Sequence, residues 1–285
     1  GKPWEPKNYD GQFDGPMSVR RALARSKNMV SIRVLQLVGT QSAQEWVTRF
    51  GFDADKHPPY LTMALGAGAV TPLQMVAGYA VFANGGYRVA PTLVTRVTES
   101  RGKPLFEAPM AAPDESQRAI DERNAFVMGS LLQEITRSGT AARASTILKR
   151  QDIHGKTGTT NDSVDAWFVG YHPTVVAAAW VGYDNPRNLG SRETGGGLSM
   201  PIWVDYMATA LREEPLANYK APPGVINVAG EWYFEEFGPS QGVQSLGLSD
   251  PWPDASMSFP PATGTEGAAP ADPEDRRSIL DLFRN

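Results

Sequence analysis

The chain has 285 residues, 41% of them hydrophobic, which is enough apolar material to bury the core of one large domain or two modest ones. Its 27 basic and 31 acidic residues give a net charge of -4 without any basic block, so nucleic acid is not expected as a partner. The sequence contains no cysteine, which excludes disulfides, thiolate nucleophiles and cysteine metal sites.

Two helices are predicted near the N-terminus, on either side of a polar break. Ser18 can cap the first helix, over residues 18–25, and an apolar-rich pattern predicts the second over residues 29–38, with Gly39 ending it. The break is Ser26-Lys27-Asn28, so three polar side chains are expected at the junction between the helices.

A third helix and a β-hairpin are predicted next along the chain. Thr71-Pro72 is typical of a helix start, and Asn84-Gly85-Gly86 ends that helix. Residues 87–99 are predicted to form the first arm of a hairpin that turns at residues 100–104. A long helix then fits residues 121–137, where apolar side chains recur at helical spacing.

Short segments rich in valine and aromatic residues follow from residue 152 onward. Residues 153–159, 164–171 and 174–183 are predicted to be three adjacent antiparallel strands. A last helix opens at Ser199-Met200-Pro201 and ends before Pro215. Helices on both sides of a compact antiparallel sheet predict an α/β domain of the layered α+β kind.

The chain is predicted to divide into a globular part, residues 1–214, and a proline-rich C-terminal extension, residues 215–285. The extension holds 10 of the 23 prolines, and residues 251–275 show no periodicity, so we expect disorder there. The opening GKPWEPKNYDG has neither an initiator methionine nor the regions of a signal peptide, so we expect a fragment that begins inside a domain.

The strand at residues 153–159 carries the most informative motif, Lys156-Thr157-Gly158-Thr159. Side chains alternate along a strand, so Lys156 and Gly158 share one face and the two threonines share the other. On an edge strand, Gly158 lets a substrate backbone approach closely, and Lys156 supplies positive potential for an anionic substrate. A phosphate-binding P-loop is excluded, because Arg150 stands where its first glycine would have to be.

The order of two motifs adds to this signal. S-x-N begins at Ser26 and K-T-G begins 130 residues later at Lys156, an order typical of penicillin-binding proteins and serine β-lactamases. The segments RRALARSKNMVSIRVL, TPLQMVAGYAVFANGG, HGKTGTTNDSVDAWFVGYHP and WVGYDN resemble class A, bifunctional penicillin-binding proteins, in particular the 1A type of Gram-negative bacteria. The resemblance covers about residues 1–212.

The resemblance implies a fold, an activity and a location. The fold would be the transpeptidase fold shared with serine β-lactamases, an antiparallel five-stranded-type sheet flanked by helices, here incomplete at its N-terminus. The activity would be crosslinking of peptidoglycan stem peptides through a serine acyl-enzyme formed on D-Ala-D-Ala, with β-lactam antibiotics as inhibitors. The protein would act at the periplasmic face of the bacterial inner membrane, without cofactor or metal, with its anchor upstream of this chain.

The resemblance also implies roles for individual residues of the two motifs. Ser26 would relay a proton to the leaving group, and Lys156 would hold Ser26 and raise the local positive potential. Asn28 would hydrogen-bond the amide of the bound peptide, and Thr157 and Thr159 would bind its terminal carboxylate. The backbone N–H of Thr159 would form half of the oxyanion hole.

The family's nucleophile lies in an S-x-x-K tetrad upstream of S-x-N, and nothing upstream of Ser26 matches it. The only such tetrad, Ser100-Arg101-Gly102-Lys103, falls in the predicted hairpin turn and is interpreted as a chance match. No nucleophile is therefore expected in this chain. The tetrad, the second oxyanion donor and a glycosyltransferase domain would precede Gly1, so the missing N-terminal part would be a partner and this fragment would be inactive alone.

Two other patterns are interpreted as accidental or structural. Residues 238–242 match the G-x-S-x-G elbow but lie in the proline-rich extension. His57, His154 and His172 lack the spacing of a metal site or a triad and are expected to be ordinary structural or surface residues. Two alternative functions stay open: a serine β-lactamase or carboxypeptidase that hydrolyses its acyl-enzyme, and a non-catalytic binding or sensor module of the same fold.

Overall fold

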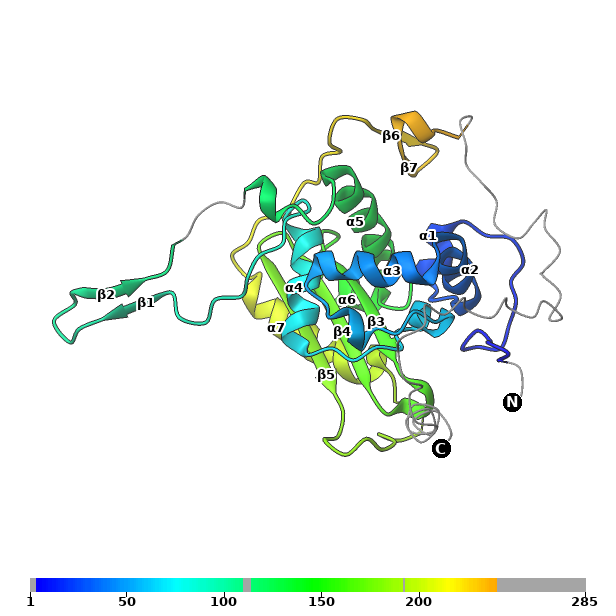
Figure 1. Cartoon of the computed structure of the whole chain (residues 1–285), viewed down its shortest axis with the longest axis horizontal. Coiled ribbons are helices and arrows are strands. Elements are labelled where there is room, and N and C mark those ends of the chain that lie inside the picture. Colours follow the sequence, from blue (N-terminus) through cyan, green and yellow to red (C-terminus); the bar gives the residue numbers. More distant parts are fainter. Residues whose placement is uncertain (1–3, 110–113, 192, 240–285) are drawn as a thin grey trace, which may run out of the picture.

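A three-stranded antiparallel sheet lies at the centre of the molecule (Figure 1). The structure, a computed structural model, describes residues 4–109, 114–191 and 193–239. All three predicted strands are found. In the described residues the central sheet has these three strands, whereas the resemblance implied a sheet of the five-stranded type. They are, in spatial order, β3 (His154–Thr159), β4 (Ala166–His172) and β5 (Val175–Val181).

Helices cover both faces of this sheet, as predicted. On one face lie α4 (Pro72–Ala83) and α5 (Glu122–Arg137), and on the other lies α7 (Met200–Ala210). The side chains of the central strand β4 point alternately to the two faces of the sheet, and those on both faces are buried. The ring of Phe168 meets Trp203 of α7 at a centroid distance of 4.8 Å, whereas the hydroxyl of Tyr171 lies beside Gly129 of α5.

The two predicted N-terminal helices are α1 (Val19–Ala24) and α2 (Asn28–Val38). Ser18 caps α1, because its hydroxyl accepts a hydrogen bond from the Arg21 N–H. Two short helices were not predicted, α3 (Thr40–Val47) and α6 (Ala142–Leu148). Helix α3 spans only 8 residues and none of them is buried, so its apolar pattern is too short to be detected in the sequence.

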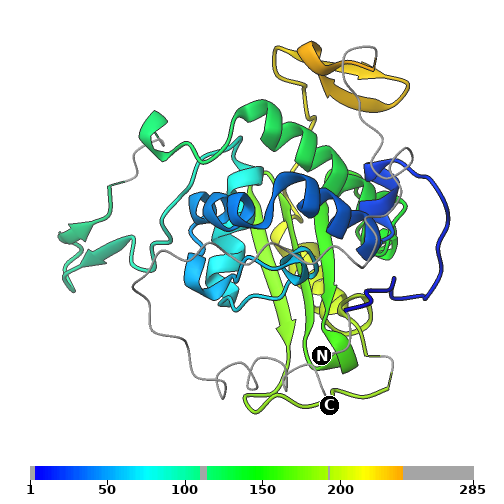
Figure 2. The ribbon, with the colours of Figure 1, turned by 45° about the vertical axis from the view of Figure 1, so that its right-hand side comes forward.

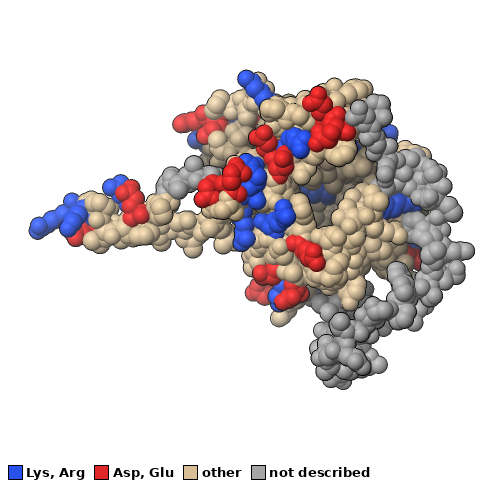
Figure 3. Space-filling view, turned by 45° about the horizontal axis from the view of Figure 1, so that its top comes forward, with Lys and Arg blue, Asp and Glu red and all other residues tan. Residues whose placement is uncertain are grey.

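A β-hairpin projects from the body of the molecule between α4 and α5 (Figure 1). It pairs β1 (Arg96–Thr98) with β2 (Pro104–Glu107), and every residue of both strands is exposed. The turn lies where it was predicted, but the first arm is shorter, because Tyr87 instead pairs with Arg118. Acidic and basic side chains are interspersed along the hairpin and over this face of the molecule (Figure 3).

A second hairpin follows α7 and lies over α5 (Figure 2). It pairs β6 (Val225–Val228) with β7 (Glu231–Phe234), and no element was predicted in this proline-rich stretch. The tail for which disorder was predicted, residues 251–275, lies outside the described residues. In the ranges that the structure describes, no helix is both long and apolar enough to cross a membrane.

Candidate active site

Ser26 lies in the turn between α1 and α2, with a left-handed backbone conformation (φ 55°). The Ser26 N–H donates to the Leu23 carbonyl at 3.0 Å, and the next N–H, of Lys27, donates to the Ala22 carbonyl at 2.9 Å. These two bonds make a Schellman helix ending, where glycine is usual because a Cβ costs about 1 kcal/mol in the left-handed region. The end of α1 therefore fixes the backbone from which the Ser26 hydroxyl projects.

Lys156 approaches that hydroxyl from β3, which is an edge strand of the described sheet. Its Nζ donates to Ser26 Oγ at 2.9 Å and to the Thr157 carbonyl oxygen at 2.7 Å. The side chain is half-buried, and no carboxylate of the described residues pairs with it. Burial lowers the pKa of Lys156 to about 8, because the ammonium loses hydration.

The Thr157 hydroxyl has a partner that was not predicted. Its Oγ1 lies 2.9 Å from Oγ1 of Thr140, which follows α5. Thr140 is held by its N–H, which donates to the Ala24 carbonyl at 3.0 Å. The approach is so close that a Cβ on Gly139 would lie 2.2 Å from that carbonyl oxygen. A Ser-Gly-Thr sequence directly after the predicted helix was the available signal for this contact.

Thr159 lies at the exposed end of β3, and its Oγ1 accepts a hydrogen bond from the Gly195 N–H at 3.1 Å. Gly195 begins a tight turn that leads into α7. A Cβ there would lie 2.1 Å from the Trp167 carbonyl oxygen and 2.4 Å from that of Gly158. Bare backbone therefore contacts β3 and β4 here, and the run of glycines at 195–197 was the unused signal for it.

The other two residues of the S-x-N motif contact the N-terminal segment. Asn28 begins α2, and its Nδ2 donates to the Lys7 carbonyl at 2.9 Å. Lys27 is buried, with its Nζ 2.6 Å from a carboxylate oxygen of Asp10 and 2.6 Å from one of Asp14. These carboxylates raise the pKa of Lys27, so its ammonium stays charged. The motif did not predict these contacts of Asn28 and Lys27 with the N-terminal segment. The S-x-N pattern leaves the middle residue, here Lys27, unspecified.

The remaining serine patterns lie elsewhere. The Ser100-Arg101-Gly102-Lys103 tetrad forms the exposed turn of the projecting hairpin, with Gly102 at φ 84°. It therefore does not begin a buried helix, which is the setting the family's nucleophile requires. Residues 240–242 of the G-x-S-x-G pattern lie outside the described residues.

The three histidines make structural contacts. His154 is buried at the start of β3 and stacks on Tyr171 with ring centroids 4.4 Å apart, and burial lowers its pKa to about 3. His172 lies 3.3 Å from a carboxylate oxygen of Asp152, and the ring of His57 meets the edge of Phe52. Within the described ranges, no group of three or more acidic or histidine side chains could hold a metal ion.

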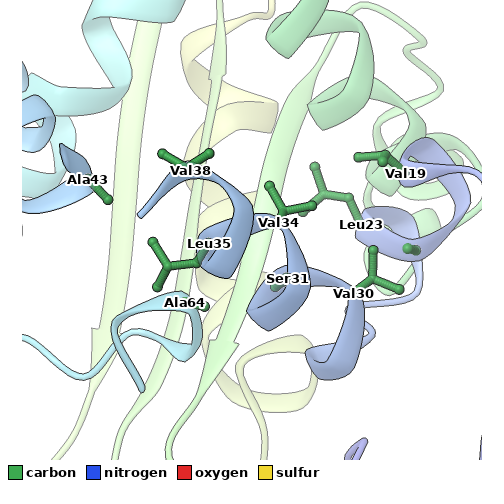
Figure 4. A pocket seen from close by; sticks show the side chains of 10 residues that line it. Val19, Leu23, Val30, Ser31, Val34, Leu35, Val38, Ala43 and Ala64 are labelled. Atoms are coloured by element: carbon green, nitrogen blue, oxygen red, sulfur yellow. The ribbon is translucent and has the colours of Figure 1, made fainter. Parts of the chain in front are cut away.

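An apolar groove lies on the N-terminal helices, apart from the Ser26–Lys156 pair (Figure 4). It has a volume of about 320 Å³ and is lined by α1, α2, α3 and the helical turn Leu61–Leu65. Ser31 is the one polar side chain among the lining residues, so the groove offers no charge and little hydrogen bonding. Chemistry on a polar substrate therefore belongs to the β3 edge.

The β3 edge can move a proton and attract an anion. The Lys156 ammonium donates to Ser26 Oγ, which leaves the Ser26 hydrogen free to point at a third group. The ammonium of Lys156 and the hydroxyls of Thr157 and Thr159, all carried by β3, are groups suited to a carboxylate, because bonds to a charged group are stronger than neutral ones. No second serine hydroxyl is hydrogen-bonded to Lys156 in the part of the chain that the structure describes.

Comparison with known proteins gives one family. A model of the penicillin binding protein transpeptidase domain matches residues 1–208. Penicillin-binding protein 1A of Neisseria flavescens is 47% identical over 237 residues, which cover 83% of this chain and 30% of that protein. The crystal structure of penicillin-binding protein 1A from Haemophilus influenzae matches with a TM-score of 0.77 at 31% identity, over 86% of this chain and 43% of that one.

A third match has a bound antibiotic. PonA1 from Mycobacterium tuberculosis, in complex with penicillin V, gives a TM-score of 0.61 at 25% identity and covers 76% of this chain and 61% of that one. The chain thus spans less than two thirds of each of these relatives.

Proposed function

Since this chain belongs to the penicillin-binding protein transpeptidase family, we propose that it forms most of the crosslinking domain of a peptidoglycan synthase. In that reaction a serine attacks the carbonyl carbon between the two D-alanines of a stem peptide, the C–N bond breaks and the terminal D-alanine leaves. An amine of a neighbouring stem peptide then takes the acyl group and releases the serine. A β-lactam acylates the same serine as a mimic of D-Ala-D-Ala.

The observation that carries this proposal is the 2.9 Å hydrogen bond from Lys156 to Ser26. Ser26 would pass a proton to the nitrogen of the departing D-alanine, and Lys156 would hold the hydroxyl in place for that transfer. The same ammonium would attract the carboxylate of the stem peptide or of a penicillin. Because Lys156 is half-buried, its field is screened less than that of a surface lysine.

The residues around this pair would bind the substrate. The hydroxyls of Thr157 and Thr159 would bind the terminal carboxylate, and the Thr159 N–H would supply one oxyanion donor. Gly158 would let the peptide backbone approach the edge of β3. Asn28 would exchange its bond to the Lys7 carbonyl for one to the substrate amide.

The nucleophile is not assigned to this chain. In the proposal, residues 1–214 act with an N-terminal part that supplies the S-x-x-K tetrad and the second oxyanion donor, and residues 215–285 are an extension. The longer protein would also carry a glycosyltransferase domain and a membrane anchor, and would act at the periplasmic face of the inner membrane.

Labelling of the full-length protein with a fluorescent penicillin tests this function. Replacement Lys156→Ala is expected to lower the acylation rate about a hundredfold or more, since it removes a charge that acts on the transition state. The matched control is Lys103→Ala on the projecting hairpin, which should acylate like the wild type.

Two results would contradict the proposal. One is a wild-type protein that takes no label, and the other is a Lys156→Ala variant with an unchanged rate. Product analysis with stem peptides separates crosslinking from the hydrolytic alternative, because only crosslinking yields joined peptides.

A further inference from the structure

Lys27 lies between the two polar residues of the S-x-N motif, yet its side chain is buried against carboxylates of the N-terminal segment. Only 5% of the residue is exposed, and its Nζ lies 2.6 Å from a carboxylate oxygen of Asp10 and 2.6 Å from one of Asp14. A lysine is almost never buried without such partners, because an unpaired ammonium away from water is costly. Asp10, Asp14 and Lys27 are called the Lys27 clamp below.

The segment that carries both aspartates makes further bonds to the same turn. Asn8 is 7% exposed, and its Oδ1 accepts a hydrogen bond from the Met29 N–H at 3.2 Å. Its Nδ2 donates to the Gln12 carbonyl at 2.6 Å, which keeps the segment folded on itself. The residue before α2 makes no side-chain cap, so Asn8 supplies from outside the acceptor that a capping residue would provide.

The turn needs such support, because Ser26 holds a left-handed conformation that disfavours a side chain. A strained residue of this kind persists only where its surroundings determine its backbone. Lys27 is fixed at both ends, since its N–H closes the helix-ending bond to Ala22 and its ammonium is held by the two carboxylates.

We propose that Lys27 is a positioning residue, and that the Lys27 clamp holds the turn so that the Ser26 hydroxyl faces Lys156. This inference rests on the proposed transpeptidase function. The clamp acts through Ser26 and does not touch the substrate, so it governs the rate of acylation and has little effect on the first binding of a β-lactam.

The test is the replacement Lys27→Met in the full-length protein, which removes the charge and keeps the length of the side chain. We expect the acylation step with penicillin to slow about ten- to a hundredfold, because a displacement of about 1 Å in a reacting group has an effect of this size. The initial dissociation constant should stay near that of the wild type. Lys27→Arg, which keeps a cation, should recover most of the rate.

The aspartates provide an independent arm of the test. The double replacement Asp10→Asn with Asp14→Asn should cause a loss similar to that of Lys27→Met, and combining all three should add little, since residues in one ion-pair network are not additive. Lys103→Met, which removes an equal charge from the projecting hairpin, should leave the rate unchanged. Hydrogen exchange should quicken at residues 22–30 in the clamp variants and stay unchanged in α5.

Several outcomes would contradict the role proposed for the Lys27 clamp. They are a normal acylation rate in folded Lys27→Met, an equal rise of exchange in α5, and a failure of Lys27→Arg to recover activity. If Lys27→Met does not fold, Asp10→Asn alone, which changes the more exposed carboxylate, gives the same comparison. A wild type that takes no penicillin would contradict the proposed function instead, and the exchange data would still decide whether the clamp orders the turn.

Discussion

Ser26 both ends helix α1 and carries a hydroxyl that contacts Lys156. The helix ending favours glycine, whereas the contact with Lys156 requires a polar side chain. The left-handed position that closes a Schellman ending is best filled by glycine, because glycine has no Cβ to strain. The serine hydroxyl, which glycine lacks, can receive the hydrogen bond from Lys156 and pass a proton on. Serine at this position therefore carries a conformational cost that its chemistry explains.

A pair of replacements separates these two requirements. Ser26→Ala and Ser26→Gly both remove the hydroxyl, so both should lose penicillin acylation in the full-length protein. Ser26→Gly also relieves the left-handed strain, and we expect it to be more stable than Ser26→Ala by about 1 kcal/mol. Thermal melting of the two variants measures this difference. Equal melting temperatures would contradict the role given to the backbone.

Lys156 makes the reaction sensitive to mildly alkaline pH. Burial lowers its pKa to about 8, from about 10.4 for a free lysine, so the ammonium is lost as pH rises through 8. Penicillin acylation should therefore fall above pH 8.

The same pKa shift affects stability. Between the folded-state pKa of about 8 and the free-lysine pKa of about 10.4, the folded state binds fewer protons than the unfolded state, so the free energy of unfolding should rise with pH. Acylation rates and melting temperatures from pH 7 to 10 test both, and a flat acylation profile would contradict the assignment.

Among the elements, the β6–β7 hairpin is attached to α5 and α1 through side chains, including an ion pair of Arg123 in α5 with Glu236 at 2.8 Å. The ring of Trp232 meets the edge of Phe126 at a centroid distance of 5.0 Å, and Arg20 of α1 contacts the carboxylate of Glu231 at 2.6 Å. Trp232→Ala should remove about 1 kcal/mol of local stability from the aromatic contact. We expect amide exchange in residues 225–237 to quicken about fivefold with the sheet unaffected. Val228→Ala, at an exposed position, is the control, and equal exchange in both variants would contradict this attachment.

The sheet could be predicted from the sequence, and two kinds of element could not. Strands β4 and β5 are short runs rich in apolar and aromatic residues, bounded by turns, and they directly follow the strand-like sequence of β3. Helix α3 spans only 8 residues and α6 only 7, so neither repeats an apolar pattern over a length that can be detected. The C-terminal hairpin depends on contacts with α5, which are distant in sequence.

The candidate site divides in the same way. Ser26 and Lys156 could be identified because their motifs have fixed residue types in a fixed order. Thr140 and Gly195 carried only a local turn signal and Lys27 carried none, since each acquires its contact only when remote segments meet. Small or charged residues of this kind occur throughout any sequence, and only the fold shows which of them reach the site.

At the scale of the whole molecule, Lys156 is hydrogen-bonded to Ser26 and to no second serine hydroxyl of the described residues. We expect the chain alone to form no covalent adduct with a labelled penicillin, since bound contacts cannot replace the missing bond-forming group. Intact mass spectrometry after incubation measures this, with the full-length protein as the positive control. A stoichiometric adduct, above all one mapped to Ser100 in the hairpin turn, would show that the tetrad there is a nucleophile after all.

The same chain is expected to be less stable than the full-length protein. The groove of Figure 4 leaves apolar side chains open to water, with Val19 51% and Val38 54% exposed. Exposed apolar surface of this kind favours association with other chains.

The contact of Gly195 with β3 limits which substitutions the proposed site can accept. Any side chain at residue 195 would meet two backbone carbonyl oxygens, which cannot move aside as a flexible side chain can. A substitution that weakens drug binding by reshaping the wall behind Gly158 would therefore disrupt β3 itself. For the proposed function, a ligand that gains its affinity from the backbone of β3 would leave fewer single substitutions by which its binding could be lost.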